Sequence, residues 1–123
     1  MSTTQAPPTS SGSRPRFLQG TFPFEGQGLE KLALLDPSLT YVVPRDREAQ
    51  LVYFRGGNSG DELVDVVIMR DGEPMRHFPI GAKESTHVPL RVLEDLLAET
   101  KLEVFAGSDG GGKLVIDIGL VEI

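Results

Sequence analysis

The sequence predicts an all-β fold, a Greek-key β-sandwich of about seven to eight strands with one short helix. Two observations lead to this prediction. The 123 residues include 14 glycines and 9 prolines, which is typical of a chain with many turns. From residue 30 onward, short runs of β-branched and other apolar residues alternate with turn signals. A chain of this length has room for one domain.

Three regions are expected along the chain. Residues 1–16 are rich in Ser, Thr and Pro without apolar periodicity, so they are predicted to form a disordered tail. Residues 17–29 are predicted to be an aromatic linker segment, and residues 30–123 the β-sandwich domain. The linker contains three phenylalanines that are expected to fold back onto the domain or to dock on a neighbour. They are Phe17, Phe22 and Phe24.

Strands are expected where apolar and β-branched residues cluster between turn signals. The predicted strands are Lys31–Leu35, Leu39–Val43, Ala49–Arg55, Leu63–Arg70, Pro74–Ile80, Ser85–Leu90, Leu102–Ala106 and Leu114–Glu122. Asp71-Gly72 is the clearest turn, because both residues tolerate the positive φ that a two-residue hairpin requires. The helix is expected between Pro89 and Glu99, where leucines recur at spacings of three and four residues.

The segment AGSDGGGKL, residues 106–114, has the spacing of a phosphate-binding loop, G-x-x-x-x-G-K. Such a loop must lead from a strand into a helix, whose N-terminal amides hold the phosphate. The residues that follow, LVIDIGLVE, are β-branched and alternating, which predicts a strand. Leu114 also stands where a magnesium-binding Ser or Thr belongs. We therefore interpret the segment as a hairpin loop and not as a nucleotide site.

Composition argues against several functions. The 12 basic and 18 acidic residues give a net charge of -6, which disfavours nucleic acid as a partner. The absence of cysteine excludes disulfides, thiolate metal sites and a cysteine nucleophile. No catalytic triad order or nucleophile motif is found, so neither enzymatic activity nor a cofactor is predicted. The apolar runs are too short for membrane insertion, and a cytoplasmic location is expected because the N-terminus lacks a signal-peptide core.

The chain has two histidines, His77 and His87. If Gly81–Lys83 closes a hairpin, the two rings face each other across neighbouring strands. Two imidazoles alone make a weak metal site, so we interpret them as a half-buried, pH-sensitive pair. Asp65 lies inside an apolar run and is expected to pair with Arg76, because a buried carboxylate needs a partner. If the protein were an enzyme, the two histidines with Asp65 would be the catalytic candidates.

The hairpin predicted around Asp71-Gly72 is apolar on both faces, although a single sandwich normally buries one face of each sheet. The register of the two predicted turns places the following residues on one face: Val64, Val66, Ile68, Met75, His77 and His87. The other face is expected to carry Leu63, Val67, Met69, Phe78, Ile80, Val88 and Leu90. One of the two faces needs a cover, so we predict that the first set binds a partner, together with Phe17, Phe22 and Phe24.

These observations favour a non-enzymatic protein-interaction or accessory subunit, which either self-associates or joins a larger complex. The alternative is a small-ligand or carbohydrate-binding module. Sites of that kind usually present aromatic platforms, and the chain offers no tryptophan and only Tyr41 and Tyr53 as tyrosines.

The stretch RGGNSGDELVDVVIMRDGEPMRHFPIGAKESTHVPL, residues 55–90, and the ending LVIDIGLVEI resemble a group of small bacterial proteins, some of which are described as molybdopterin oxidoreductases. The resemblance extends over residues 41–123 and lies in the general pattern of residue types, without a diagnostic motif. The chain has no cysteine ligand and no nucleotide-cofactor motif. The resemblance therefore implies a small companion of a redox or assimilation enzyme, and no functional residue is transferred from it.

Overall fold

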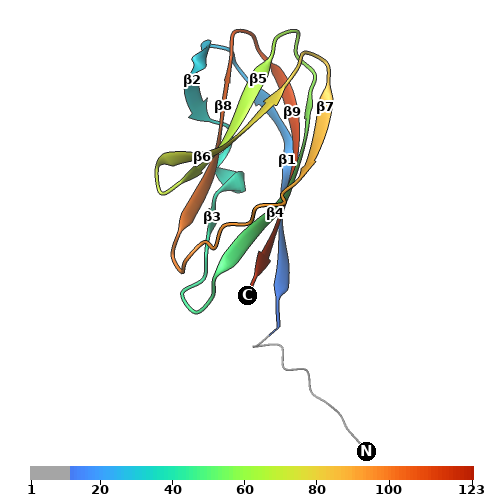
Figure 1. Ribbon diagram of the computed structural model, residues 1–123. Coiled ribbons are helices and arrows are strands. Elements are labelled where there is room, and N and C mark those ends of the chain that lie inside the picture. Colours follow the sequence, from blue (N-terminus) through green and yellow to red (C-terminus); the bar gives the residue numbers. More distant parts are fainter. Residues whose placement is uncertain (1–11) are drawn as a thin grey trace, which may run out of the picture.

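The computed structural model describes residues 12–123 and shows two antiparallel β-sheets packed face to face (Figure 1). The first sheet has the order β1-β9-β4-β7. Its strands are β1 (Arg14–Phe24), β9 (Gly112–Glu122), β4 (Ala49–Asn58) and β7 (Ser85–Pro89). The second sheet has the order β2-β8-β5-β6, with β3 beside β8. Its strands are β2 (Gly28–Leu34), β8 (Lys101–Ser108), β5 (Val64–Arg70), β6 (Glu73–Ile80) and β3 (Tyr41–Val42). The predicted β-sandwich is confirmed.

The core lies between the two sheets and is built from alternate residues of the strands. Phe54 of β4 and Phe78 of β6 stack across the interface with ring centroids 4.2 Å apart. Along β9 the inward residues are apolar and almost fully buried, and they are Leu114, Ile116, Ile118 and Leu120. All eight predicted strands are present, with boundaries that differ by a few residues. The segment AGSDGGGKL leads into strand β9 and not into a helix, as predicted for a hairpin loop.

The prediction missed strand β1, because residues 14–16 were assigned to the tail and residues 17–29 to a linker. Residues 14–24 instead pair with β9 along their whole length. Pro15 and Pro23 obscured the strand in the sequence, since proline is excluded from the middle of a sheet but tolerated at an edge, and β1 is an edge strand. The rest of the predicted tail, residues 1–11, lies outside the described residues.

The helix predicted between Pro89 and Glu99 is wrong. Within residues 12–123 the structure has one helical turn, the 3₁₀ helix η2 (Pro37–Leu39), and no α-helix. The connection from β7 to β8 crosses one end of the sandwich in an extended form, and Leu96 exchanges backbone hydrogen bonds with Ala49 at 2.8 and 2.9 Å. Of its leucines only Leu96 is fully buried, so the spacing did not reflect one packed helical face.

A one-residue bulge changes the faces of the hairpin β5–β6. Next to the turn, Arg70 pairs with Glu73 and Met69 with Pro74, as the predicted register requires. Beyond Met75 the register shifts by one residue. Because side chains alternate along a strand, this shift moves every later residue of β6 to the opposite face. The later residues Phe78 and Ile80 therefore point into the core beside Val66 and Val64.

The hairpin predicted between β6 and β7 does not form, because the two strands belong to different sheets. Between β6 and β7 the chain crosses from one sheet to the other. This crossover is stabilised by Asn58, whose side chain is buried at 4% exposure. Its amide group donates to the carbonyl oxygens of Glu62, Ile80 and Gly81, and its Oδ1 accepts from the amide of Gly60. A buried amide group satisfied in this way fixes the turn that carries the chain from one sheet to the other.

The second apolar face of β5 needs no external cover. Val67, on the outer side of the five-stranded sheet, is fully buried. It lies between His77 of β6 and Phe105 of β8, its cross-strand neighbours. Large side chains on flanking strands thus cover a single valine. The described residues contain no helix long and apolar enough to cross a membrane.

Candidate functional site

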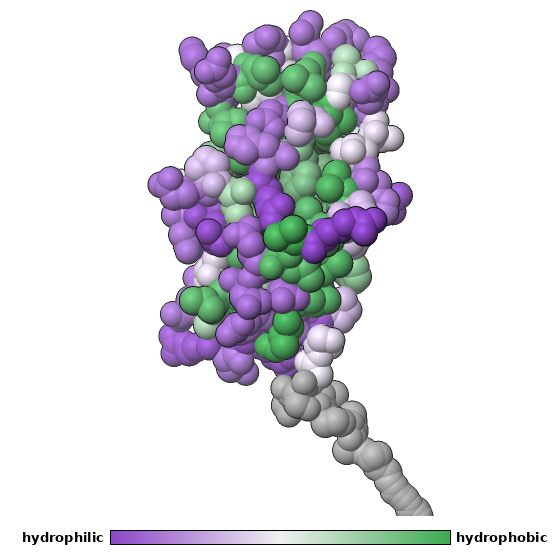
Figure 2. Space-filling view, viewed as in Figure 1, coloured by the Kyte–Doolittle hydropathy of each residue, from purple (hydrophilic) through white to green (hydrophobic). Residues whose placement is uncertain are grey.

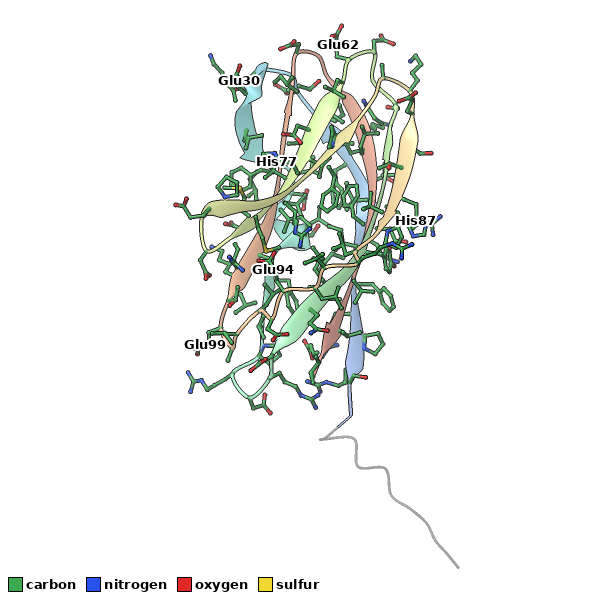
Figure 3. The ribbon with its side chains drawn as sticks, viewed as in Figure 1. Glu30, Glu62, His77, His87, Glu94 and Glu99 are labelled. Carbon is green, nitrogen blue, oxygen red and sulfur yellow. The ribbon has the colours of Figure 1, made fainter. Side chains whose placement is uncertain are left out.

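The outer face of the four-stranded sheet carries a groove of about 490 Å³. It runs over the centre of the sheet, where β4 lies between β9 and β7. The residues that line it are Arg55, Gly56, Gly57, Ser85, Thr86, His87, Val115 and Asp117. Figure 3 shows His87 projecting outward from this sheet, on the side of the molecule away from the second sheet.

The groove exists because Gly57 has no side chain. Gly57 lies between Val115 of β9 and Ser85 of β7 in one cross-strand row. A β-carbon at Gly57 would meet the β-carbons of these two neighbours at 3.8 and 3.9 Å, which are ordinary contacts. The preceding Gly56 faces the core and has a different role, because a β-carbon there would collide with the ring of Phe54. Gly56 thus allows close packing in the core, and Gly57 leaves the hollow on the outer face.

Aromatic rings border one end of the groove. Tyr53 of β4 and Phe17 of β1 both lie opposite Gly119 of β9. The ring of Tyr53 rests directly on the backbone of Gly119, where any β-carbon would overlap it. Tyr53 and His87 meet edge to face with ring centroids 6.1 Å apart, and Phe17 is 55% exposed. This arrangement presents aromatic surface to solvent beside a polar hollow.

Asp117 is the central polar group of the site. Its Oδ1 accepts hydrogen bonds from Gln19 Nε2 at 3.0 Å and from the Tyr53 hydroxyl at 2.8 Å. Arg55 Nη1 lies 3.9 Å from Oδ2, a loose ion pair. The hydrogen bond from Gln19, helped by that from Tyr53 and by the charge of Arg55, lowers the pKa of Asp117 despite partial burial. Burial and the bond to Asp117 raise the pKa of Tyr53. The site therefore holds a fixed carboxylate beside a largely unengaged guanidinium.

Strand β1, which supplies Phe17 and Gln19, is fastened at its start by a buried carboxylate. Glu122 of β9 lies between the sheets and is 1% exposed. Its Oε2 accepts from Arg16 Nε at 3.1 Å and from the hydroxyl of Tyr41, which belongs to the other sheet. Arg14 Nη2 lies 3.0 Å from Oε1 in ion-pair contact, without hydrogen-bond geometry. Glu122 thus links β1, the strand that supplies Gln19 and Phe17, to both layers.

We expect the thermal stability to fall in acid through Glu122. Burial raises the pKa of Glu122, but the hydrogen bonds from Tyr41 and Arg16 and the arginine charges outweigh it and hold the pKa below its usual 4.5. A carboxyl group with a lowered folded-state pKa stabilises the fold above its unfolded-state pKa, and this contribution is lost as the pH falls through the folded-state value. The melting temperature should therefore drop below about pH 4.5. In Glu122→Gln the acid-induced drop should be shallower, and an unchanged pH profile would contradict this assignment.

The partner-binding surface predicted from the sequence is not assembled. Val64, Val66 and Ile68 are at most 1% exposed and belong to the core between the sheets. Met75 is partly buried against that core, so these four positions form no exposed face. The reason is that the face of β5 carrying Val64, Val66 and Ile68 is the one that packs against the other sheet, while the bulge and the crossover separate His77 and His87 from it.

The three phenylalanines have separate environments. Phe22 is buried at 8% exposure, and Phe24 packs partly against the core, as expected for a segment folded back onto the domain. Phe17 alone is exposed, on β1 opposite Gly119.

The two histidines do not face each other, because they lie in different sheets (Figure 3). His77 Nδ1 lies 2.8 Å from Asp65 Oδ2, a contact that the bulge creates by turning His77 to the outer face. The predicted pairing of Asp65 with Arg76 is wrong, since Arg76 contacts Glu94 and the carbonyl oxygen of Val92. No group of three or more potential metal ligands is found in residues 12–123.

Sequence reasoning missed the groove, its residues Arg55, Gly57 and Asp117, and the roles of Gln19 and Tyr53 beside it. One signal was present in the sequence. In LVIDIGLVE the alternation places Asp117 and Gly119 on the face opposite the isoleucines, so a polar group and a gap could be expected on one wet face. The partners of Asp117 come from β1 and β4, which lie 98 and 64 residues away in the chain.

Together the fold and the groove define a small β-sandwich with a polar, aromatic-edged hollow on one sheet. The structure is similar to the CBM36-1 domain, a carbohydrate-binding module, of a multidomain xylanase from the hindgut metagenome of Trinervitermes trinervoides. The TM-score is 0.54 at 13% sequence identity, and the match covers 88% of this chain and 96% of that domain. This similarity shows the fold. No protein-family model and no curated protein matches the sequence. The resemblance to the molybdopterin oxidoreductase group stays a prediction.

Proposed function

We propose that the protein is a non-enzymatic binding module and that its ligand is a carbohydrate chain lying in the groove over Gly57. The observation that carries this proposal is the combination of a polar groove whose floor lacks a side chain with aromatic side chains in the cross-strand row beyond one end of it. Sugar rings offer apolar C–H faces to aromatic rings and hydroxyl groups to planar hydrogen-bonding side chains. Tyr53 and Phe17 supply the aromatic rings. Arg55 and Asp117 supply the planar hydrogen-bonding side chains.

The chemistry of Asp117 supports the same function. Its Oδ1 is occupied by Gln19 and Tyr53, so the carboxylate is held in one orientation before a ligand arrives. The distance of 3.9 Å between Asp117 Oδ2 and Arg55 Nη1 is too long for a hydrogen bond. The carboxylate therefore keeps a free acceptor position, and the guanidinium keeps free donor positions. Preorganised polar groups reduce the entropy that binding must offset. The similar structure is itself a carbohydrate-binding module, which agrees with this proposal.

Filling the groove floor tests the proposal. In Gly57→Leu the new side chain would occupy the hollow while its β-carbon makes ordinary contacts, so the fold should persist. We expect the affinity for soluble polysaccharides to fall roughly ten-fold or more, because even one extra methylene group in a binding pocket can cost about that much. Affinity electrophoresis against a panel of neutral and acidic glycans, followed by calorimetry, measures the effect.

Glu73→Leu is the matched control, since it adds the same side chain at an exposed position of the other sheet. This variant should bind as the unmodified protein does. The proposal fails if no glycan in the panel binds to the unmodified protein, or if Gly57→Leu binds with unchanged affinity.

A protein-interaction function is the second candidate, and a specific observation favours it. The connection between β7 and β8 exposes three apolar side chains, Val92 at 71%, Leu93 at 43% and Leu97 at 62%. Figure 2 shows apolar surface gathered where this connection crosses the sandwich. Exposed apolar patches often mark contact surfaces. A change of Leu97 to Asp should abolish any self-association seen in sedimentation, and a monomeric mass for the unmodified protein would exclude self-association.

A further inference from the structure

The groove over Gly57 continues along the sheet toward a more basic end. A second hollow of about 380 Å³ shares Gly57, Ser85 and Val115 with the first and extends it to Lys83 and Lys113. Asp117 and Lys113 lie four residues apart on β9, which corresponds to about 13 Å along the strand. The combined groove therefore runs parallel to the strands and has the shape to hold an extended chain.

The charges in this combined groove differ in sign from those of the protein as a whole. The chain carries a net charge of -6, but the groove contains three basic residues, Arg55, Lys83 and Lys113, against two acidic ones. Of the acidic pair, Asp117 already accepts two hydrogen bonds. The carboxylate of Glu84 lies folded over Gly81 in the crossover turn. Asp117 lies about 13 Å along β9 from Lys113, so it does not neutralise that end of the groove.

Two of the basic groups are free to contact a ligand. Lys83 is engaged, since its ammonium lies 2.9 Å from Asp61 Oδ1. The Arg55 side chain is 61% exposed, and its contact with Asp117 is long. Lys113 is exposed and its ammonium makes no ion pair within the part of the chain that the structure describes. The guanidinium of Arg55 and the ammonium of Lys113 thus lie near opposite ends of the combined groove.

We infer that the ligand is an acidic polysaccharide, a chain of uronic acids whose carboxylates pair with Arg55 and Lys113. This inference rests on the proposed carbohydrate-binding function and adds the class of glycan. The planar guanidinium of Arg55 matches a carboxylate in a two-point contact, and His87 lies directly opposite it on β7 as a further donor. Lys113, on β9 in the second hollow, supplies a less directional contact to another carboxylate of the chain. The net negative charge elsewhere repels a polyanion, which confines binding to this groove.

Polygalacturonate and its fully methyl-esterified form make a matched pair of probes, because they share one backbone and differ in the charge of the carboxyl group. We expect the acid form to bind roughly ten-fold or more tightly than the ester, as measured by calorimetry at low salt. Binding of the acid form should weaken at high salt, where charge pairs at the surface are screened.

Two variants locate the contacts. Arg55→Gln should lose about ten-fold in affinity for the acid form, and Lys113→Gln a few-fold. The matched controls are Arg91→Gln and Lys31→Gln, which remove exposed basic residues outside the groove and should leave the affinity unchanged. Equal losses in the controls and in the groove variants would overturn the inference.

The outcomes separate this inference from the function on which it rests. If the ester binds as tightly as the acid, or if only a neutral glycan binds and Gly57→Leu abolishes that binding, the acidic class is wrong and the carbohydrate function stands. If neither probe nor any neutral glycan binds, both proposals fail.

Discussion

Val66→Lys is expected to unfold the domain. The sequence predicts that Val66 lies on a partner-binding face, where a lysine would leave the fold intact. In the structure Val66 is fully buried between the sheets, paired with Phe78 on one side and Ala106 on the other. A lysine ammonium there would be unpaired in an apolar core, and burying such a charge costs about 4 kcal/mol or more, a large part of the stability of a domain of this size.

The matched control is Val92→Lys, which makes the same substitution at a valine that is 71% exposed. Its effect on stability should stay within about 0.5 kcal/mol. Circular dichroism with urea denaturation compares the two variants. A folded, stable Val66→Lys protein would contradict the assignment of this residue to the core and restore the predicted binding face.

Phe54→Ala is expected to destabilise the domain by about 3–5 kcal/mol. Phe54 is fully buried and stacks on Phe78 with an interplanar angle of 7°, so its removal leaves a cavity at the contact between the sheets. Its ring also covers Gly56, where the structure has no room for a β-carbon. The loss of contacts on both sides leaves little scope for the neighbouring side chains to fill the cavity.

Phe17→Ala provides the comparison, because Phe17 is 55% exposed on the same sheet. Its stability loss should be below about 1 kcal/mol, while its glycan affinity should fall if the aromatic edge of the groove takes part in binding. Equal destabilisation by the two changes, measured in urea, would show that the Phe54–Phe78 contact is not the centre of the core.

The charge pattern explains why the basic groove was invisible in the composition. An overall charge of -6 argues against polyanions as partners when the surface is considered as a whole. The sheet nevertheless gathers Arg55 and Lys113 from two strands into one hollow. Net charge describes the average field and does not reveal the local one.

The sequence by itself determined the fold class and the positions of eight strands. Short β-branched runs between turn residues carry this information locally, because strand propensity and the alternation of burial act within a few residues. The Asp71-Gly72 turn was also a local property. Its residues adopt the positive φ values that the hairpin needs, 51° and 86°.

Only the tertiary structure decided which face of each strand is buried and which residues form the site. The bulge at Met75 arises where β5 and β6 pair, and the crossover depends on bonds from Asn58 to residues 22 and 23 positions away. Each reverses a face that local alternation had assigned. Likewise, Gln19, Tyr53 and Asp117 meet because β1, β9 and β4 are neighbours in a sheet, not in the chain. A period of two residues fixes which side chains lie together on a strand, but the choice between core and solvent is made by the partner strands.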